Sequence, residues 1–267
     1  MHGQTIRNVW TSNKPQTFKS TPALIAETLT LARIELVHRV GKTIVVDLAY
    51  PTTTPSEPAQ LLIHLGMTGR LLVSTSDTPI PPHTHLILSL SAGKELRFVD
   101  ARRFGRLSIY KPTDDAPADN PQTEKYTGPG SEPLTIAPAK FAALFRKRKT
   151  PIKAALLNQS LLHGVGNIYA DESLFRAGIR PTRHAGRLTR AQLERLRLAL
   201  VDVLTHAIQL GGSSVSDYVD ADGVRGFFQL EHRVYGRAGQ TCTICTTPLK
   251  KLTVAGRTTI YCPTCQK

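Results

Sequence analysis

The sequence predicts an α+β protein in which an antiparallel β-sandwich is followed by a helical domain and a metal-clamped β-hairpin. In the first half, short runs with alternating apolar residues are separated by frequent turn signals, as is typical of antiparallel sheets. After about residue 138 the apolar period becomes helical. All four cysteines lie in two C-x-x-C pairs within the last twenty-six residues.

The expected elements of the first half are short. Residues 5–10 form a strand, and residues 22–29 form a helix with Thr21 as its cap. The other expected strands are residues 32–40, 43–48, 60–65, 70–74, 85–90, 95–99 and 105–110. Residues 51–58 are rich in threonine and proline, which indicates a loop.

The second half begins after a segment, residues 111–133, that contains five prolines and a local acidic cluster and is expected to connect two domains. The expected helices are residues 139–146, 151–158, 167–177 and 189–210. The apolar face of the last helix consists of Leu193, Leu196, Leu200, Val203, Leu204 and Ala207. Two glycines end this helix, and a polar loop follows over residues 213–230.

The four cysteines, Cys242, Cys245, Cys262 and Cys265, have the spacing of a tetrahedral zinc site, with sixteen residues between the two pairs. The residues between the pairs predict a hairpin with Arg257 at its tip. So short a segment buries too little apolar surface to fold alone, and metal binding supplies roughly 10–16 kcal/mol in isolated finger peptides. The alternatives are two disulfides or four free thiols.

Length and charge limit the class of protein. The 267 residues are enough for two domains, each with its own core. There is no apolar run that could cross a bilayer and no secretory segment, so a cytoplasmic location is expected. The net charge of +14 favours a polyanion such as nucleic acid, although a solubilising surface would also explain it.

Four stretches together resemble a known family. They are Gly164-Val165-Gly166-Asn167-Ile168-Tyr169-Ala170-Asp171-Glu172, Asp100-Ala101-Arg102-Arg103-Phe104-Gly105, His64-Leu65-Gly66-Met67-Thr68-Gly69 and Val234-Tyr235-Gly236-Arg237. With the cysteines, they resemble the Fpg/Nei-type formamidopyrimidine-DNA glycosylases, and more closely the Fpg (MutM) branch, from about Gly3 to Lys267.

The resemblance implies a β-sandwich over residues 1–126 without the family's first helix, a linker over 127–138, a helix–two-turn–helix domain over 139–230 and a zinc finger over 231–267. It implies a glycosylase and AP lyase of base-excision repair that removes 8-oxoguanine and formamidopyrimidines from DNA, followed by β- and δ-elimination. The expected cofactor is one structural Zn²⁺. The expected partner is damaged double-stranded DNA, and no membrane partner is expected. The protein is expected to be a monomer associated with a bacterial nucleoid.

The resemblance also implies roles for particular residues. Met67, Arg102 and Phe104 would fill the space left by the extruded nucleotide, and Arg102 would pair with the orphaned base. Lys42 would contact phosphate near the lesion and assist proton transfer, and Arg257 would grip phosphate and serve the second elimination. The further expected DNA contacts are His83, Arg148, Lys153 and Asn167. Residues 213–229 correspond to the segment that covers the extruded base.

The residues by themselves leave other interpretations open. Met67 and Phe104 could be core residues, and Lys42 could be a solvated charge. Asn167 could simply cap a helix, and Arg257 could be an exposed turn residue. At Arg148 the family usually has a lysine, so the charge is kept and the donor geometry changes.

The beginning of the chain departs from the family pattern. Family members start, after the initiator methionine, with Pro-Glu-Leu-Pro-Glu and a helix, in which the proline amine attacks C1′ and the glutamate acts as acid and base. Here Met1-His2-Gly3 aligns beyond that helix, so the pair is absent. The Met1 amine is a nucleophile in principle, but it starts a helix away. An uncovered sandwich face and poor stability are therefore expected.

Three explanations for this beginning stay open: a true start further upstream, a catalytically silent reader of damaged DNA, and a decayed remnant. A different class, a zinc-ribbon module that binds RNA or transcription factors, explains the finger and the charge. It does not explain residues 164–172 or 100–105.

Overall fold

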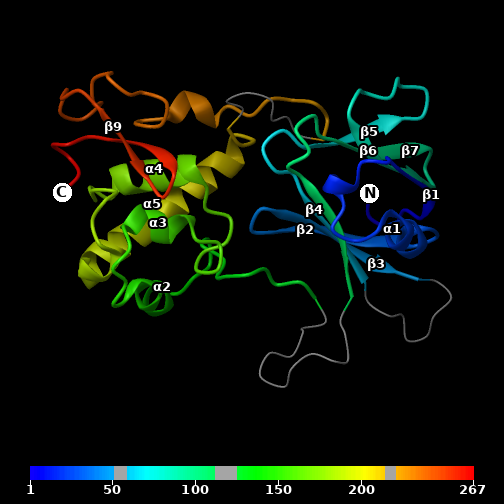
Figure 1. The fold of residues 1–267 in the computed structure, drawn as a ribbon, viewed down its shortest axis with the longest axis horizontal. Helices are drawn as coiled ribbons and strands as arrows, with labels where there is room; N and C mark the ends of the chain where they lie inside the picture. Colours follow the sequence, from blue (N-terminus) through cyan, green and yellow to red (C-terminus); the bar gives the residue numbers. More distant parts are fainter. Residues whose placement is uncertain (51–58, 112–124, 214–220) are drawn as a thin grey trace. The chain divides into compact units, whose positions relative to one another are not determined.

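The computed structural model describes residues 1–50, 59–111, 125–213 and 221–267 (Figure 1). The chain divides into two compact units, which are described separately. The first contains residues 1–127 with the described residues 221–226, and the second contains residues 128–213 and 227–267. The loop expected at 51–58, most of the connection expected at 111–133 and the first part of the loop expected at 213–230 lie outside the described residues.

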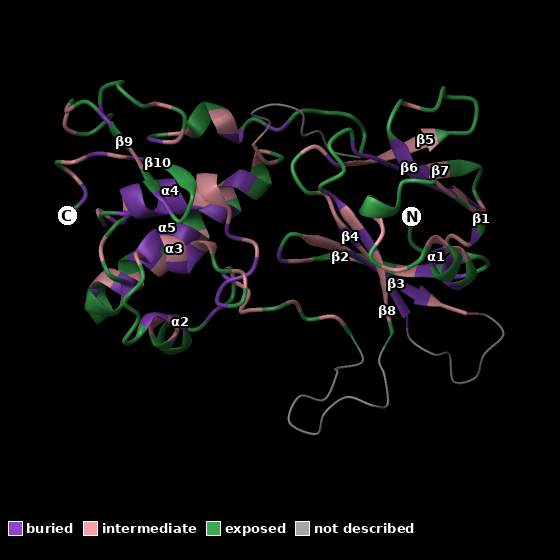
Figure 2. Ribbon diagram, in the orientation of Figure 1, coloured by how far each residue is buried: buried purple, intermediate pink, exposed green. Residues whose placement is uncertain are grey.

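The first unit contains two four-stranded antiparallel sheets, with the orders β1-β6-β7-β5 and β2-β3-β4-β8. Their strands are β1 (Ile6–Thr11), β2 (Arg33–Val40), β3 (Thr43–Ala49), β4 (Ala59–His64), β5 (Arg70–Thr75), β6 (Thr84–Leu90), β7 (Lys94–Val99) and β8 (Arg106–Tyr110). Both sheets contribute fully buried side chains to one core, among them Ile34 and Leu61 from one sheet and Leu86 and Phe98 from the other. Figure 2 colours the ribbon by burial and shows buried stretches along β4 and β6. The predicted sandwich is confirmed.

The helix α1 (Pro22–Leu29) closes part of this core. Thr21 caps it, because its hydroxyl accepts a hydrogen bond from the Leu24 N–H at 3.2 Å. Ile25 and Leu29 are fully buried in the core of the sandwich. A 3₁₀ helix, η1 (Pro15–Thr17), precedes α1.

The alternation predicted for residues 32–40 holds only at its start. Ala32 and Ile34 are fully buried, but Leu36 and Val37 are 48% and 41% exposed. The β2–β3 register shifts between Ile34 and Leu36. An extra residue in one strand changes which face each later side chain occupies, so the shift accounts for the exposed apolar residues.

The second unit is helical. It contains α2 (Pro138–Phe145), α3 (Ile152–Leu157), α4 (Asn167–Arg176) and α5 (Arg190–Gln209), with 3₁₀ helices η2 (Ala185–Arg187) and η3 (Phe228–Glu231). A capping box between Thr189 and Gln192 starts α5. All six apolar residues predicted for the inner face of α5 are buried. Phe228 is also fully buried, against α5 side chains, where the sequence pattern indicates only a loop.

The hairpin at the end of the chain pairs β9 (Lys250–Val254) with β10 (Arg257–Tyr261). Ala255 and Gly256 between them both have positive φ, 49° and 70°. Two such residues in succession make the tight turn whose twist matches that of paired strands. The turn therefore places Arg257 at the tip, as predicted.

Candidate nucleic-acid interface

In the first unit, the turn at residues 66–69 is fixed to the loop at residues 100–105. The carboxylate of Asp100 is fully buried and accepts hydrogen bonds from the Thr68 hydroxyl and from the Gly105 N–H, the latter at 2.7 Å. Gly66 has a φ of +67°, and a Cβ there would lie 2.7 Å from the Gly105 nitrogen. Only glycine permits this approach, so the two loops form one rigid support.

This support presents the three residues expected to fill the space of an extruded nucleotide. Met67 and Phe104 are 60% and 48% exposed, so neither is a core residue. The guanidinium carbon of Arg102 lies 4.8 Å from the centroid of the Phe104 ring, which is a cation–π arrangement. Arg102 is exposed as well, and its backbone N–H donates to the Thr68 hydroxyl oxygen at 3.4 Å.

Nearby in the same unit is a hollow of about 720 Å³, lined in part by Trp10, Lys14, His83 and Arg103. His83 and Arg103 both have left-handed backbones, with φ of 64° and 56°. The His83 carbonyl accepts a hydrogen bond from the Asp100 N–H at 3.0 Å, which ties this hollow to the rigid support. Among the described residues that line it there is no acidic side chain, so it suits an anion.

Lys42 occupies the exposed turn between β2 and β3. His64, at the end of β4, is a neighbour that sequence reasoning did not select. Its Nδ1 accepts a hydrogen bond from the Gly66 N–H at 3.1 Å. Burial, with smaller effects from the charges of Lys42 and Arg106, lowers the pKa of His64. The neutral ring therefore carries its hydrogen on Nε2. The only signal for this residue in the sequence is its position two residues before the glycine turn that begins at Gly66.

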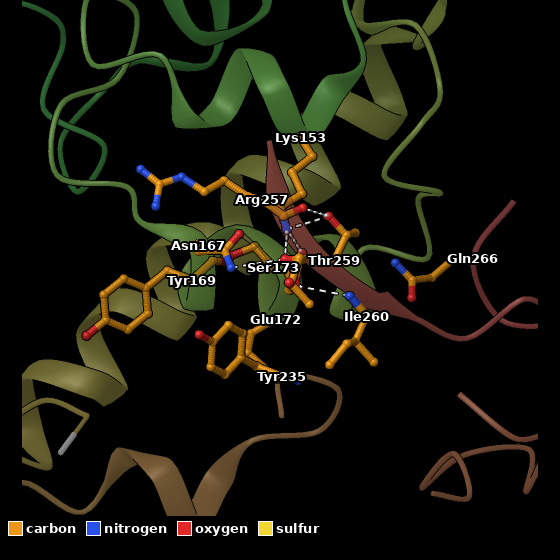
Figure 3. A network of polar contacts seen from close by, with 12 residues as sticks. Lys153, Asn167, Tyr169, Glu172, Ser173, Tyr235, Arg257, Thr259, Ile260 and Gln266 are labelled. Atoms are coloured by element: carbon orange, nitrogen blue, oxygen red, sulfur yellow. Dashed lines mark hydrogen bonds and ion pairs between the residues drawn. The ribbon is translucent and has the colours of Figure 1, made fainter. Parts of the chain in front are cut away.

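In the second unit, the start of α4 meets the tip of the hairpin. Asn167 is the first residue of α4, and its side-chain amide donates to the Thr258 carbonyl at 3.0 Å. Arg257, the preceding residue, is exposed. Residues 91 positions apart in sequence are thereby brought together, as Figure 3 shows. The first turn of a helix offers backbone N–H groups to anions, which suits a phosphate here.

Arg148 and Lys153 lie in different environments. Arg148 is exposed, and its Nε donates to the Leu144 carbonyl. Lys153, which the resemblance implies as a DNA contact, is instead fully buried. Its ammonium forms an ion pair with Asp171 at 2.7 Å, so it is not a surface cation in this structure.

The ligand atoms of the four cysteines all lie within 4.8 Å of one another. All four are free. The sulfurs of Cys245 and Cys262 are 3.4 Å apart and those of Cys242 and Cys265 are 3.9 Å apart, well beyond a disulfide bond. Hydrogen bonding with Thr247 lowers the pKa of Cys245 to about 6, whereas burial raises the pKa of Cys262 and Cys265. Four thiols gathered in this way could hold a metal ion.

No helix within the described part of the chain has the length and apolar character needed to cross a membrane.

Comparison with known proteins gives matches along the chain. The N-terminal domain model of formamidopyrimidine-DNA glycosylases matches residues 1–107, and the H2TH domain model of the same enzymes matches residues 128–219. A formamidopyrimidine-DNA glycosylase of Solibacter usitatus is 43% identical over 246 residues, which are 92% of this chain and 86% of the relative.

Solved structures give the same result. Lactococcus lactis Fpg in complex with DNA containing an abasic site has a TM-score of 0.85 at 30% identity, covering 100% of this chain and 94% of that one. MutM (Fpg) of Thermus thermophilus has a TM-score of 0.81 at 38% identity, covering 100% and 92%. On its sequence, its fold and the residues gathered in its two units, this chain belongs to the formamidopyrimidine-DNA glycosylase family.

Proposed function

We propose that this protein is a DNA glycosylase of base-excision repair, which removes oxidised purines from damaged duplex DNA and then cuts the strand by β- and δ-elimination. The observation that carries the proposal is the rigid support that presents Met67, Arg102 and Phe104 to solvent. Extrusion of a nucleotide leaves a gap that costs a few kcal/mol of stacking. Apolar wedges fill such a gap, and the planar donors of Arg102 suit the orphaned base, which we expect to be cytosine.

Phosphate contacts are proposed for two sets of residues. Asn167 donates to the carbonyl of Thr258, the residue next to Arg257, and Asn167 and Arg257 together suit one stretch of DNA backbone. The others are Lys42, His83 and Arg148, all of which are exposed. Lys42 would also assist proton transfer near the lesion, and Arg257 would assist the second elimination.

The metal of the cysteine cluster is proposed to be one structural Zn²⁺. Four thiolates are the typical ligand set of closed zinc sites, because Zn²⁺ takes four sulfur ligands as a tetrahedron. The ion would hold the base of the β9–β10 hairpin and thereby the position of Arg257. We expect the protein to act as a monomer on nucleoid DNA in a bacterial cytoplasm.

The attack on C1′ is assigned to no residue among the 267. In the family it belongs to an amino-terminal proline followed by glutamate, and none of the 18 prolines here is followed by glutamate. A second candidate function would use the same exposed Met67, Arg102 and Phe104, in a protein that binds damaged DNA without cutting it.

Two measurements test the proposal. At fixed salt, the affinity for a duplex with an abasic-site analogue should exceed that for the intact duplex, and equal affinities would contradict both candidate functions. Borohydride should trap no covalent adduct between residues 1–267 and 8-oxoguanine DNA, but it should trap one when the family's Pro-Glu segment and helix precede them. An extended protein that binds lesions without trapping would support the silent reader, and trapping by the 267 residues alone would show that another amine serves.

A further inference from the structure

Lys153 and Asp171 form an ion pair in the interior of the second unit, between α3 and α4. The two charged atoms are 2.7 Å apart, and both side chains are 0% exposed. The same ammonium donates to the Thr259 hydroxyl at 2.7 Å and to the Thr258 carbonyl at 3.0 Å. An ammonium has three N–H donors, so these three acceptors leave none for a DNA phosphate (Figure 3).

All of these contacts lead to β10, the strand that begins with Arg257. The Thr258 carbonyl that accepts from Lys153 also accepts from the Asn167 amide, at 3.0 Å. The second carboxylate oxygen of Asp171 accepts from the Ile260 N–H at 3.2 Å. Thus α3, the start of α4 and β10 are joined directly beside Arg257.

Glu172, the next residue of α4, holds the chain where it approaches the finger. Its carboxylate accepts the backbone N–H groups of Arg233, Val234 and Tyr235 at 2.9–3.1 Å. Two successive carboxylates of one helix therefore grip the finger at two points, one on β10 and one before Cys242. This fixes the direction in which the hairpin leaves α4.

Stability alone does not explain the buried pair. Burial lowers the pKa of Lys153 and raises the pKa of Asp171 to about 6, so the loss of water outweighs the mutual attraction for both groups. Apolar residues can often replace such a pair without loss of stability, whereas directional polar contacts can specify one arrangement. Here the contacts set the course of β10 and hence of Arg257, whose guanidinium points away from the ammonium (Figure 3).

We propose that Lys153 and Asp171 are positioning residues, which hold Arg257 and Asn167 where both reach the DNA backbone, and that Lys153 makes no phosphate contact of its own. This inference rests on the phosphate contacts proposed above for Arg257 and Asn167. A lysine that bound phosphate directly would add its own share of affinity. A positioning lysine acts only through the residues that it places.

The test is the double variant Lys153→Met/Asp171→Leu, which leaves the net charge unchanged and replaces the pair by apolar side chains. Its affinity for a duplex containing a tetrahydrofuran abasic-site analogue should fall about tenfold, because the charged groups that make the hydrogen bonds to β10 are removed. In an Arg257→Ala/Asn167→Ala background the same two changes should have no further effect. An equal loss of DNA affinity in both backgrounds, with about one fewer counterion released on binding, would reveal a direct phosphate contact and overturn the inference.

A second variant decides the matter if the double variant fails to retain its metal. Asp171→Asn keeps the shape of the side chain and should weaken binding several-fold, although the loss of a negative charge by itself favours DNA binding. Glu194→Gln is the matched control, because the Glu194 carboxylate on α5 also pairs with a cation, Arg197, but its side chain is 39% exposed. This variant should leave affinity unchanged or slightly raised. Equal increases in DNA affinity from Asp171→Asn and Glu194→Gln would overturn the inference. If Arg257→Ala/Asn167→Ala alone leaves affinity unchanged, the proposed phosphate contacts are wrong, which is a distinguishable result.

Discussion

The guanidinium of Arg102 lies over the ring of Phe104, 4.8 Å from its centroid, while the ring itself is about half exposed. A charged group and an apolar wedge from one loop thus support each other at the surface. The arrangement is formed before DNA binds, because the Asp100 carboxylate fixes the loop through its hydrogen bond from the Gly105 N–H. Little side-chain order then has to be gained on binding, which favours affinity.

The first prediction concerns the wedge. Phe104→Ala should weaken binding to a duplex with an abasic-site analogue by about 1–3 kcal/mol, the range measured when stacked aromatic side chains are removed. Binding to intact duplex and the free energy of unfolding should change by less than about 0.5 kcal/mol, because the ring is half exposed. Leu198→Ala, which removes another exposed apolar side chain, is the control for both measurements. An equal loss for intact and lesion duplex would show that Phe104 does not enter a gap.

The second prediction concerns the close approach at Gly66. Gly66→Ala forces a Cβ to within 2.7 Å of the Gly105 nitrogen and places alanine at a φ of +67°, so we expect more than about 1 kcal/mol of destabilisation. The preference for lesion over intact duplex should also fall, because the loops that carry Met67 and Phe104 would separate. Gly93→Ala is the matched control: its φ is +76°, but no atom lies within 4 Å of the added carbon. If both variants unfold at the same temperature and keep the preference for lesion over intact duplex, the packing of the two loops does not determine stability or that preference.

The third prediction concerns the metal. Analysis of the purified protein should find one zinc per chain, and removal by a strong chelator should abolish most salt-sensitive DNA binding, since Arg257 loses its fixed position. The helical core should persist in far-UV circular dichroism, because the buried residues of α2 to α5 form a cluster of their own. Adding Zn²⁺ back should restore binding. Protein without metal and with two disulfides would contradict the assignment.

Much of the fold follows from local patterns. The inner face of α5 was predictable because the six apolar residues repeat with the helical period, and the hairpin because Ala255-Gly256 interrupts two runs of strand-forming residues. The cysteine spacing likewise predicts the cluster. These features depend on residues close together in sequence.

The features that could not be predicted depend on distant partners. Lys153 follows four successive basic residues, 146–149, and therefore resembles a surface contact. Yet Asp171, eighteen residues later, and a hairpin about a hundred residues away enclose it. The exposure of Leu36 depends on a register shift that alternation alone does not reveal. Phe228 looks like part of a polar loop until the last turns of α5 are placed beside it.

The last prediction concerns pH. Asp171 has a pKa of about 6 in the folded protein, raised by burial from an ordinary value of 3.8, so the folded state takes up its proton more readily than the unfolded chain. The stability contributed by this group is therefore fully present below about pH 3.8 and is lost as the pH rises through about 6. Wild type should lose stability relative to Asp171→Asn over this window, as measured by thermal unfolding at each pH.

DNA binding should depend on pH in the opposite sense. Above pH 6 Asp171 is charged and holds the Lys153 ammonium, with the charges of Glu172 and Arg257 nearby, so wild type should bind the abasic-site duplex more tightly than Asp171→Asn. Below that value the carboxyl is neutral like the amide, and the ratio of the two dissociation constants should approach one. The remaining titratable groups are common to both proteins, so their effects on the two dissociation constants cancel in the ratio. A ratio that stays constant from pH 5 to pH 8 would mean that the charge of Asp171 does not help to hold the finger. The ion pair would then cost stability without placing Arg257.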